Sequence, residues 1–307
     1  MATPVLRLGT RGSPLARAQS QQVADAVMAA MPDVRVELVI FKTTGDQVQD
    51  RPLADLGGKG LFTKELEQAL IDGRIDFAVH SYKDVPVTMP LVDVSSLTIE
   101  TVPKREDPRD VLVTLNGVSV DRLPLSAKIG TGSLRRRCQL QRLRPDLQIE
   151  GIRGNIDTRL RKLAEGQFDA IVLAAAGLKR AGMFDATTMI MLPVADMIPS
   201  PGQGALAIQT RRGDVQTDRY LATLHDPETA RCVAIERQIV LGLNGDCHSP
   251  IAAYAEPVET GIRLHAAVGA TDGGQPVRRF FLTSSADDDS LAARAVAKLS
   301  ASPGGAV

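Results

Sequence analysis

One stretch decides how the chain folds: Asp76-Phe77-Ala78-Val79-His80-Ser81-Tyr82-Lys83-Asp84-Val85-Pro86. It begins as a short apolar run, typical of a buried strand, and ends in a Lys-Asp pair before a proline that stops the strand. In an open α/β sheet, ligands bind beyond the carboxyl ends of the strands. The stretch therefore predicts a cation, Lys83, and a carboxylate, Asp84, at the edge of the sheet where ligands bind.

The composition is that of an ordinary globular protein, and it excludes some functions. The chain has 307 residues, which predicts two or three domains. Its 36 basic and 36 acidic residues cancel and only 3% are aromatic, so we expect no nucleic-acid partner. The N-terminus has no apolar signal segment, and no apolar run is long enough to cross a membrane. We therefore expect a cytoplasmic protein with no membrane partner.

An anion-binding turn follows the first predicted strand, which spans 5–10. In Arg11-Gly12-Ser13-Pro14, Ser13 suits the N-cap of a helix and Pro14 suits its first position. A strand, a polar turn and a helix N-terminus can bind an anion, because free N–H groups and the helix dipole point at the ligand. The sequence leaves two readings of Ser13 open: it binds an anion with Arg11, or it only caps the helix.

A glycine-rich segment follows the second predicted strand, which spans 34–41. Gly57-Gly58-Lys59-Gly60-Leu61-Phe62 surrounds a lysine with glycines, but its spacing is not that of a phosphate-binding P-loop. We interpret the segment as a mobile loop that carries Lys59 and Phe62. A helix predicted over 63–72 then leads into the stretch quoted first.

The segment before the opening strand recurs later in the chain. A glycine, two further residues, an aspartate and an apolar run follow a predicted helix at Gly73–Val79 and again at Gly166–Val172. This repeat predicts two similar βα lobes, each with its own sheet. We expect the first lobe to span 1–100 and 199–217, with a return crossover near Gly202, and the second lobe to span 103–195.

A basic band dominates the second lobe. From Lys128 to Lys162 there are ten Lys/Arg and three acidic residues, a surplus of seven positive charges. We interpret three of these side chains as a solvated face, namely Arg142, Arg144 and Arg161. Four others lie at strand ends and helix starts, where the crevice is expected: Arg135, Arg136, Arg153 and Arg159. Arginine pairs with carboxylates in a planar, bidentate way and stays charged when desolvated, so we expect a ligand with several carboxylates or phosphates.

The helix predicted over 134–143 has a second anion-binding N-terminus. Ser133 is its N-cap, and Gly130-Thr131-Gly132 resembles the start of a dinucleotide fingerprint. Arg135 stands where that fingerprint needs glycine or alanine, so the match to a dinucleotide-binding site is weak. What remains is a capped helix N-terminus followed by arginines.

A small α+β domain is predicted over 220–307. Cys138 in the second lobe and Cys232 in this domain are interpreted as buried hydrophobic residues. Cys247 lies beside His248 in a loop framed by glycine and proline, and is either a reactive thiol or attachment point or an ordinary loop residue. Three separate cysteines make no disulfide framework, and without a second ligand pair at metal spacing we expect no metal site.

These motifs resemble the porphobilinogen deaminase (hydroxymethylbilane synthase) family, in the same order, from about Val5 to Tyr254. The matching segments are 8–16, 57–62, 80–86, 132–136, 153–155, 201–205 and the Cys247 loop. The resemblance implies an α/β fold of two lobes like those of periplasmic binding proteins, with chain crossovers, plus a small α+β C-terminal domain.

The resemblance also implies a reaction and a cofactor. Members of the family are transferases that join four porphobilinogen units head to tail, with loss of ammonia, to give linear hydroxymethylbilane in tetrapyrrole biosynthesis. The product grows on a dipyrromethane cofactor held by a thioether to a cysteine, which by position is Cys247. The resemblance suggests a monomer. The alternative function is a non-catalytic, two-lobed binder of small carboxylates.

The resemblance assigns roles to the residues singled out above. Asp84 is expected to hold pyrrole N–H groups and to stabilise the positive charge that develops as ammonia leaves. Each pyrrole carries an acetate and a propionate, which accounts for the arginines in a neutral protein. Cofactor contacts are expected from Asp84, Ser13, Lys83, Ser133, Arg135 and Arg136. Substrate contacts are expected from Arg11, Arg153 and Arg159, and from Lys59 and Phe62 of a flap.

Two positions depart from the family pattern. Asp246 stands where members often carry glycine just before the attachment cysteine, and Asp55 stands where many carry lysine. We expect a carboxylate beside Cys247 to slow cofactor attachment unless it points away. Asp55 would remove one cationic contact.

Overall fold

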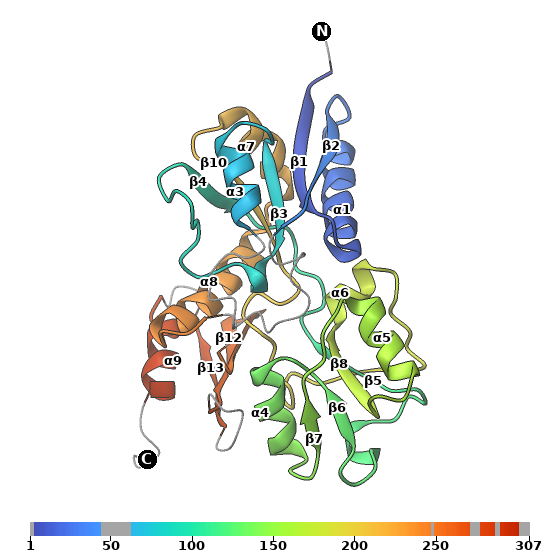
Figure 1. The fold of residues 1–307 in the computed structure, drawn as a ribbon. Coiled ribbons are helices and arrows are strands. Elements are labelled where there is room, and N and C mark those ends of the chain that lie inside the picture. The colour runs from blue at the N-terminus through green and yellow to red at the C-terminus, as the bar shows by residue number, and fades with distance from the viewer. Residues whose placement is uncertain (1–2, 44–62, 247–248, 271–276, 286–288, 301–307) are drawn as a thin grey trace. The chain divides into compact units, whose positions relative to one another are not determined.

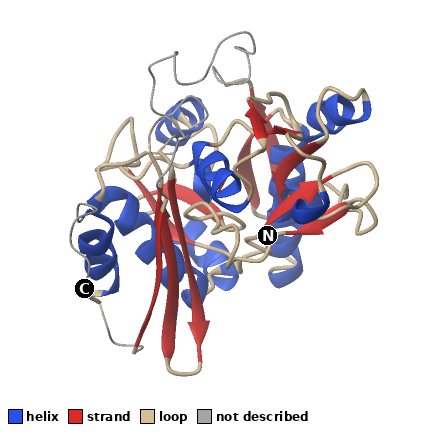
Figure 2. Cartoon of the chain, turned by 90° about the horizontal axis from the view of Figure 1, so that it is seen from below, coloured by secondary structure: helices blue, strands red, loops and turns tan. Residues whose placement is uncertain are grey.

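The computed structural model describes residues 3–43, 63–246, 249–270, 277–285 and 289–300. The chain divides into two compact units, Met1–Glu106 with Ala205–Ala230 (unit 1) and Asp107–Gly204 with Arg231–Val307 (unit 2). Figure 1 labels their helices and strands, and Figure 2 distinguishes the two types by colour. Within the described ranges, every helix is too short or too polar to span a membrane.

Unit 1 is built on a five-stranded sheet of order β2-β1-β3-β10-β4. β1 pairs in parallel with β2 and β3, whereas β10 runs antiparallel to β3 and β4. The strands are β1 (Val5–Arg11), β2 (Arg35–Phe41), β3 (Phe77–Ser81), β4 (Leu97–Thr101) and β10 (Leu206–Arg211). The helices are α1 (Pro14–Ala30), α3 (Lys64–Ile71) and α7 (Val215–Leu221), with 3-10 turns η2 (Tyr82–Asp84) and η4 (Ala222–Leu224).

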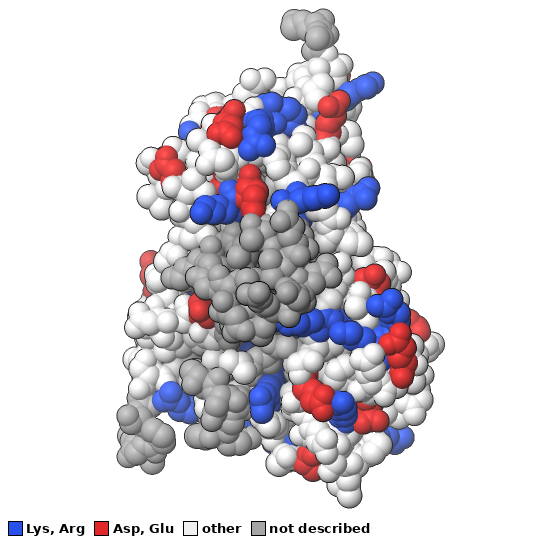
Figure 3. All heavy atoms as spheres, viewed as in Figure 1, with Lys and Arg blue, Asp and Glu red and all other residues white. Residues whose placement is uncertain are grey.

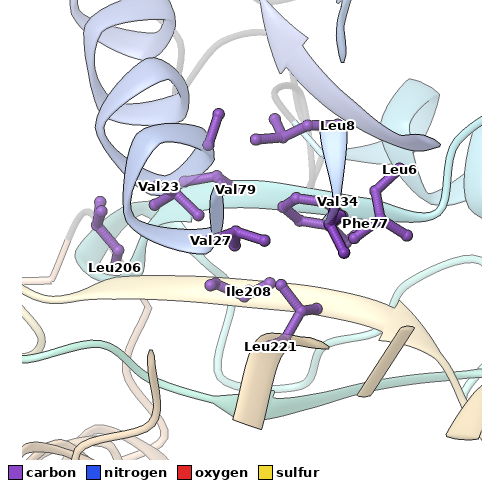
Figure 4. Packing of buried hydrophobic residues seen from close by; sticks show 11 residues of the cluster. Leu6, Leu8, Val23, Val27, Val34, Phe77, Val79, Leu206, Ile208 and Leu221 are labelled. Carbon is purple, nitrogen blue, oxygen red and sulfur yellow. The ribbon is translucent and has the colours of Figure 1, made fainter. Parts of the chain in front are cut away.

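Helices cover both faces of β3. Phe77 is fully buried in a cluster with Leu8 of β1, Val27 of α1 and Ile208 of β10, and Figure 4 shows these side chains meeting between the helix and the strands. The next residue, Ala78, belongs to a separate cluster with side chains of α3, because successive strand residues point to opposite faces. The continuous apolar run of the opening stretch is therefore a strand buried on both sides.

Unit 2 contains two sheets. The larger has the order β7-β6-β8-β5-β9, and the smaller is antiparallel with the order β11-β12-β13. The first comprises β5 (Asp110–Val113), β6 (Lys128–Gly130), β7 (Gln148–Glu150), β8 (Ala170–Ala174) and β9 (Met189–Met191). The second comprises β11 (Ile251–Val258), β12 (Gly261–Val268) and β13 (Arg278–Ser284). The helices are η3 (Val120–Arg122), α4 (Leu134–Leu143), α5 (Ile156–Ala164), α6 (Ala175–Arg180), α8 (Pro227–Gly242, which begins in unit 1) and α9 (Leu291–Ser300).

The two larger sheets share one design. In each, parallel strands are followed by an antiparallel strand from a chain crossover, which is β10 in unit 1 and β5 in unit 2. The repeated aspartates occupy equivalent places: Asp76 accepts a hydrogen bond from the backbone N–H of Arg7 at 2.7 Å, and Asp169 accepts one from Lys128 at 2.7 Å. The repeat in the sequence therefore corresponds to two similar lobes.

The structure confirms the mixed α/β fold of two sheet lobes and a small third sheet. The predicted return crossover is also confirmed, because β10 follows the second lobe in sequence but lies between β3 and β4. Helix α4 spans the predicted range 134–143. Both cysteines predicted to be buried are so, since Cys138 is 1% exposed and Cys232 is 3% exposed.

One interpretation of the basic band is wrong. Arg144 is not part of a solvated face, because its guanidinium donates to the carbonyl oxygens of Val120 and Leu123 and pairs with Asp146 at 2.7 Å. Arg144 therefore connects the end of α4 to the loop around η3 through these hydrogen bonds. Arg161 is solvated as expected, with 69% of its side chain exposed. Figure 3 shows Lys and Arg interspersed with Asp and Glu on the visible face, in keeping with zero net charge.

Candidate active site

The carboxyl ends of β1 and β3 lie at one edge of the sheet in unit 1, because these strands are parallel. β1 ends at Arg11, and β3 ends at Ser81 and continues into η2 with Lys83 and Asp84. The buried Gln19 of α1 hydrogen-bonds Ser81, with 3.0 Å between Nε2 and Oγ. The structure therefore brings Arg11, Lys83 and Asp84 to the same edge of the sheet.

Ser13 caps α1. Its Oγ accepts a hydrogen bond from the backbone N–H of Ala16 at 3.4 Å, and Pro14 is the first helical residue. The cap uses the hydroxyl oxygen as an acceptor, so the hydroxyl hydrogen can still be donated. Capping and anion binding at Ser13 are therefore compatible.

The turn η2 presents Asp84 at the surface while its neighbours are anchored. Tyr82 N–H donates to the carbonyl of Ala205 at 3.0 Å, and Val85 is 3% exposed. Asp84 is exposed and Lys83 is half-buried. Within the described ranges, no side chain or backbone N–H hydrogen-bonds the Asp84 carboxylate, which leaves it open to a ligand.

His80 lies behind this turn and is buried, with 6% exposure. Its Nε2 is 3.1 Å from Oε1 of Gln209 on the neighbouring strand β10. Burial lowers the pKa of His80 to about 4, against the hydrogen bond with Gln209, and the positive charge of Arg11 lowers it further. His80 is therefore neutral near pH 7 and does not add a positive charge to the site.

The equivalent edge of unit 2 carries two loops that touch. Thr131, after β6, donates its backbone N–H to the carbonyl of Glu150 at the end of β7 at 2.8 Å. Ser133 caps α4, and its Oγ accepts from the backbone N–H of Arg136 at 3.5 Å. The N-termini of α4 and α5 therefore follow neighbouring strand ends, which is an arrangement suited to anions.

The two arginines predicted at α5 lie at this edge. Arg153 is exposed in the loop after β7, and Arg159 is half-buried in the first turns of α5. The Nε of Arg159 donates to the carbonyl of Gly154 at 2.8 Å, where the backbone has a positive φ of 108°. A side chain at Gly154 would meet Thr158 at 2.6 Å, so both sterics and backbone favour glycine there.

Arg135 and Arg136 are buried and paired, a state that the sequence did not reveal. They are 4% and 6% exposed, and both contact Asp110, which is fully buried at the start of β5. Nη1 of Arg135 and Nη2 of Arg136 each lie 2.7 Å from a carboxylate oxygen of Asp110. Burial raises the pKa of Asp110, but the two guanidinium charges outweigh burial and hold its pKa well below the usual range.

This cluster carries a net positive charge and retains donors. Gln203 also donates to Asp110, at 2.9 Å. The Nε of Arg135 is buried and has no hydrogen-bond partner within the part of the chain that the structure describes. Each guanidinium has five N–H donors, so the pairing with one carboxylate does not use them all.

The donor set fits a ligand with several carboxylates. Hydroxyl, ammonium and guanidinium groups lie at the carboxyl edges of the two larger sheets, together with the N-termini of helices α1, α4 and α5. These groups all donate hydrogen bonds, and most are cationic. Among the described residues, no group of His, Cys, Asp and Glu side chains is arranged to hold a metal ion.

Some predicted residues lie outside the described ranges, namely Lys59, Phe62, Cys247, His248 and Asp55. Asp246 is described, and its Oδ1 accepts hydrogen bonds from both the backbone N–H and the hydroxyl of Ser249 at 3.0 Å. Asp246, which stands where family members often carry glycine, is therefore a carboxylate that is hydrogen-bonded to Ser249.

Sequence reasoning missed Gln19, Asp110, Glu67 and Gln209, which are all buried polar residues. A signal existed for two of them. Asp110 directly precedes an apolar strand, and Gln209 interrupts one, and a polar residue in such a place needs a buried partner. The partners themselves are far away in sequence, so the signal could not name them.

Comparisons with known proteins cover nearly the whole chain. The family model described as porphobilinogen deaminase, dipyromethane cofactor binding domain, matches residues 6–219, and the model of the porphobilinogen deaminase C-terminal domain matches residues 230–296. A porphobilinogen deaminase of Syntrophobacter fumaroxidans is 49% identical over 278 residues, which cover 91% of this chain and 88% of the relative.

Solved structures of other kinds are more distant. A periplasmic VFT2 domain of Bordetella pertussis BvgS is 17% identical with a TM-score of 0.38, covering 76% of this chain and 94% of that domain. A ligand-binding component of an ABC-type import system from Staphylococcus aureus is 12% identical with a TM-score of 0.40, covering 77% of this chain and 73% of that one. The family models and the close relative decide the assignment: the chain belongs to the porphobilinogen deaminase family.

Proposed function

We propose that the chain is a transferase that condenses four porphobilinogen units head to tail, with loss of ammonia, to give hydroxymethylbilane. Dipyrromethane, bound through a thioether to Cys247, supplies the acceptor pyrrole on which the condensation starts. The observation that carries the proposal is the exposed carboxylate of Asp84, held at the carboxyl edge of a buried strand in a member of this family.

Asp84 acts as a fixed negative charge. Departure of ammonia leaves positive charge on the pyrrole, and a carboxylate held nearby stabilises that charge more than it stabilises the neutral substrate. Two unit charges at 4 Å interact by about 4 kcal/mol at an effective dielectric constant of about 20. Since about 1.4 kcal/mol changes a rate tenfold, the charge accounts for roughly a thousandfold acceleration. The same carboxylate accepts hydrogen bonds from pyrrole N–H groups.

The cationic and hydroxyl groups bind acetate and propionate side chains. In unit 1 these groups are Arg11, Ser13 and Lys83, which lie at the same sheet edge as Asp84. In unit 2 they are Ser133, Arg135, Arg136, Arg153 and Arg159. We propose that Ser13, Lys83, Ser133, Arg135 and Arg136 bind the cofactor, and that Arg11, Arg153 and Arg159 bind substrate. The pairing of Arg135 and Arg136 with Asp110 supports this role, because it fixes two guanidinium groups before any ligand arrives.

The remaining assignments rest on the resemblance to the family. Lys59 and Phe62 belong to a flap that contacts substrate, and three domains (1–100 with 199–217, 103–195 and 220–307) divide the chain. The enzyme works in the cytoplasm as a monomer.

The test is incubation with porphobilinogen, followed by measurement of ammonia and of a linear tetrapyrrole. The wild-type protein should release both, whereas a non-catalytic binder of carboxylates would bind the substrate and release neither.

The variant Asp84→Asn tests the role of the carboxylate. It should keep the fold and the cofactor but lose roughly 10²- to 10³-fold in turnover, because the amide is neutral. Asp72→Asn is the matched control, since Asp72 is also an exposed aspartate of unit 1, with 42% of its side chain exposed. Near-normal turnover by Asp84→Asn would refute the proposed role.

A further inference from the structure

Three buried polar side chains lie behind the Asp84 turn, and the proposed reaction does not use them. Glu67 of α3 and Gln209 of β10 are fully buried, and His80 of β3 is 6% exposed. Nε2 of Gln209 lies 3.5 Å from Oε1 of Glu67, and Oε1 of Gln209 lies 3.1 Å from Nε2 of His80. The three side chains therefore form a continuous hydrogen-bonded chain across the sheet.

Glu67 sets the direction of this chain. A carboxylate offers only acceptor atoms, so Gln209 must turn its N–H₂ group toward Glu67. The amide oxygen of Gln209 then faces His80, and the neutral imidazole must carry its proton on Nε2 to donate to that oxygen. Nδ1 of His80 is consequently left as an acceptor.

Glu67 also holds the other side of the turn. Its Oε2 accepts hydrogen bonds from the backbone N–H groups of Leu91 and Val92, at 2.9 and 2.8 Å. These residues follow η2, whereas His80 precedes it. The buried carboxylate of Glu67 is thus linked by hydrogen bonds to the polypeptide both before and after the turn that contains Lys83 and Asp84.

We propose that Glu67 is a positioning residue for the Asp84 turn, which it holds through Leu91 and Val92 and through the tautomer that it imposes on His80. The inference rests on the proposed role of Asp84 as the reacting carboxylate. A turn fastened on both sides keeps Asp84 in place relative to the pyrrole, and a displacement of about 1 Å can cost a large part of the rate.

The variant Glu67→Gln tests the proposal. It keeps the size of the side chain but introduces an N–H₂ donor that would face the N–H₂ of Gln209. To avoid this clash Gln209 must flip, and His80 must then accept at Nε2 and move its proton to Nδ1. We expect this change of tautomer in the NMR chemical shifts of the His80 ring nitrogens near neutral pH. We also expect kcat to fall about tenfold with little change in KM, because carboxylate binding is untouched.

The double variant Glu67→Gln/Gln209→Glu is the matched control. The new carboxylate at position 209 accepts from His80 and from the new amide at position 67, whose oxygen accepts from Leu91 and Val92. Every hydrogen bond is restored, so the Nε2–H tautomer and most of kcat should return. This holds even if Glu67→Gln alone folds poorly, because the double variant should then recover both the fold and the tautomer.

Two outcomes would overturn the proposal: an unchanged His80 tautomer in Glu67→Gln, or a double variant no closer to wild type than the single one. The tautomer is measured without turnover, so it separates this inference from the proposed function. Normal turnover by Asp84→Asn would remove the role of Asp84, whereas the His80 tautomer would still decide whether Glu67 directs the chain of hydrogen bonds.

Discussion

His80 shows how burial decides the state of a single residue. In the sequence it stands four residues before Asp84, the proposed reacting carboxylate. In the fold it is 6% exposed and its pKa is lowered to about 4, first by burial and also by the charge of Arg11, so it works as a neutral hydrogen-bond donor. His80 is therefore close in sequence to the proposed reacting carboxylate, but it does not change its protonation state near neutral pH.

The lowered pKa of His80 predicts a pH dependence of stability. The unfolded chain binds this proton below about pH 6.5 and the folded chain only below about pH 4, so protonation favours the unfolded state in between. His80 thus contributes stability that is present above about pH 6.5 and is lost as the pH falls toward 4.

The substitution His80→Gln, which keeps a neutral donor toward Gln209, should flatten this dependence by up to about 1.4 kcal/mol per pH unit. Urea unfolding of both proteins at several pH values between 4 and 7 measures it. Parallel pH curves for the two proteins would contradict the prediction.

At the scale of elements, the Asp110 cluster (Asp110, Arg135, Arg136 and Gln203) connects the segment where the polypeptide enters the second lobe with the segment where it leaves that lobe. Besides its bond to Asp110, Arg135 donates to the carbonyl of Ile198, and Gln203 donates to the carbonyl of Pro108 at 2.7 Å. The start of β5, the first turn of α4 and the segment before β10 therefore share one buried ionic cluster. Such a cluster depends on each partner, since loss of one leaves a buried charge unpaired.

The variant Asp110→Asn should therefore be costly. It leaves two buried guanidinium groups without their anion, and we expect the free energy of unfolding to fall by about 3–5 kcal/mol. Asp72→Asn is the matched control, because Asp72 pairs with Arg74 at the surface, where the two side chains are 42% and 53% exposed. That change should cost about 1 kcal/mol or less. Chemical denaturation of the two variants measures the difference, and equal losses would argue against the cluster.

The repeated segment shows what a short pattern can predict about elements. Gly73 and Gly166 adopt φ values of 66° and 72° after helices α3 and α5, a conformation that favours glycine. Three residues later, Asp76 accepts a hydrogen bond from Arg7 of β1 and Asp169 accepts one from Lys128 of β6, which in each sheet is the parallel neighbour of the strand that follows the aspartate. The pattern is local in sequence and dictated by backbone geometry, which is why it predicted two similar lobes.

At the scale of the whole molecule, the proposed cofactor makes a prediction about mass. The intact protein should exceed its sequence mass by one dipyrromethane, and Cys247→Ser should remove the excess. Cys232→Ala is the control, because Cys232 is buried in α8 and should not affect attachment. Intact-protein mass spectrometry measures all three proteins. An active protein of unmodified mass would contradict covalent attachment.

The sequence by itself determined the main strands and helices around the candidate site, the two-lobed repeat, and the sheet edges at which Asp84 and Arg11 lie in unit 1 and Ser133 lies in unit 2. These features depend on local periodicity, caps and strand ends, so neighbouring residues specify them. Buried pairings were decided only by the tertiary structure. The partners of His80 and Asp110 in Gln209 and Gln203 are 129 and 93 residues away in the chain, and only sheet register and helix packing bring them together. That is why the sequence could mark arginines as ligand-binding candidates but could not show that Arg135 and Arg136 are already held by a buried carboxylate.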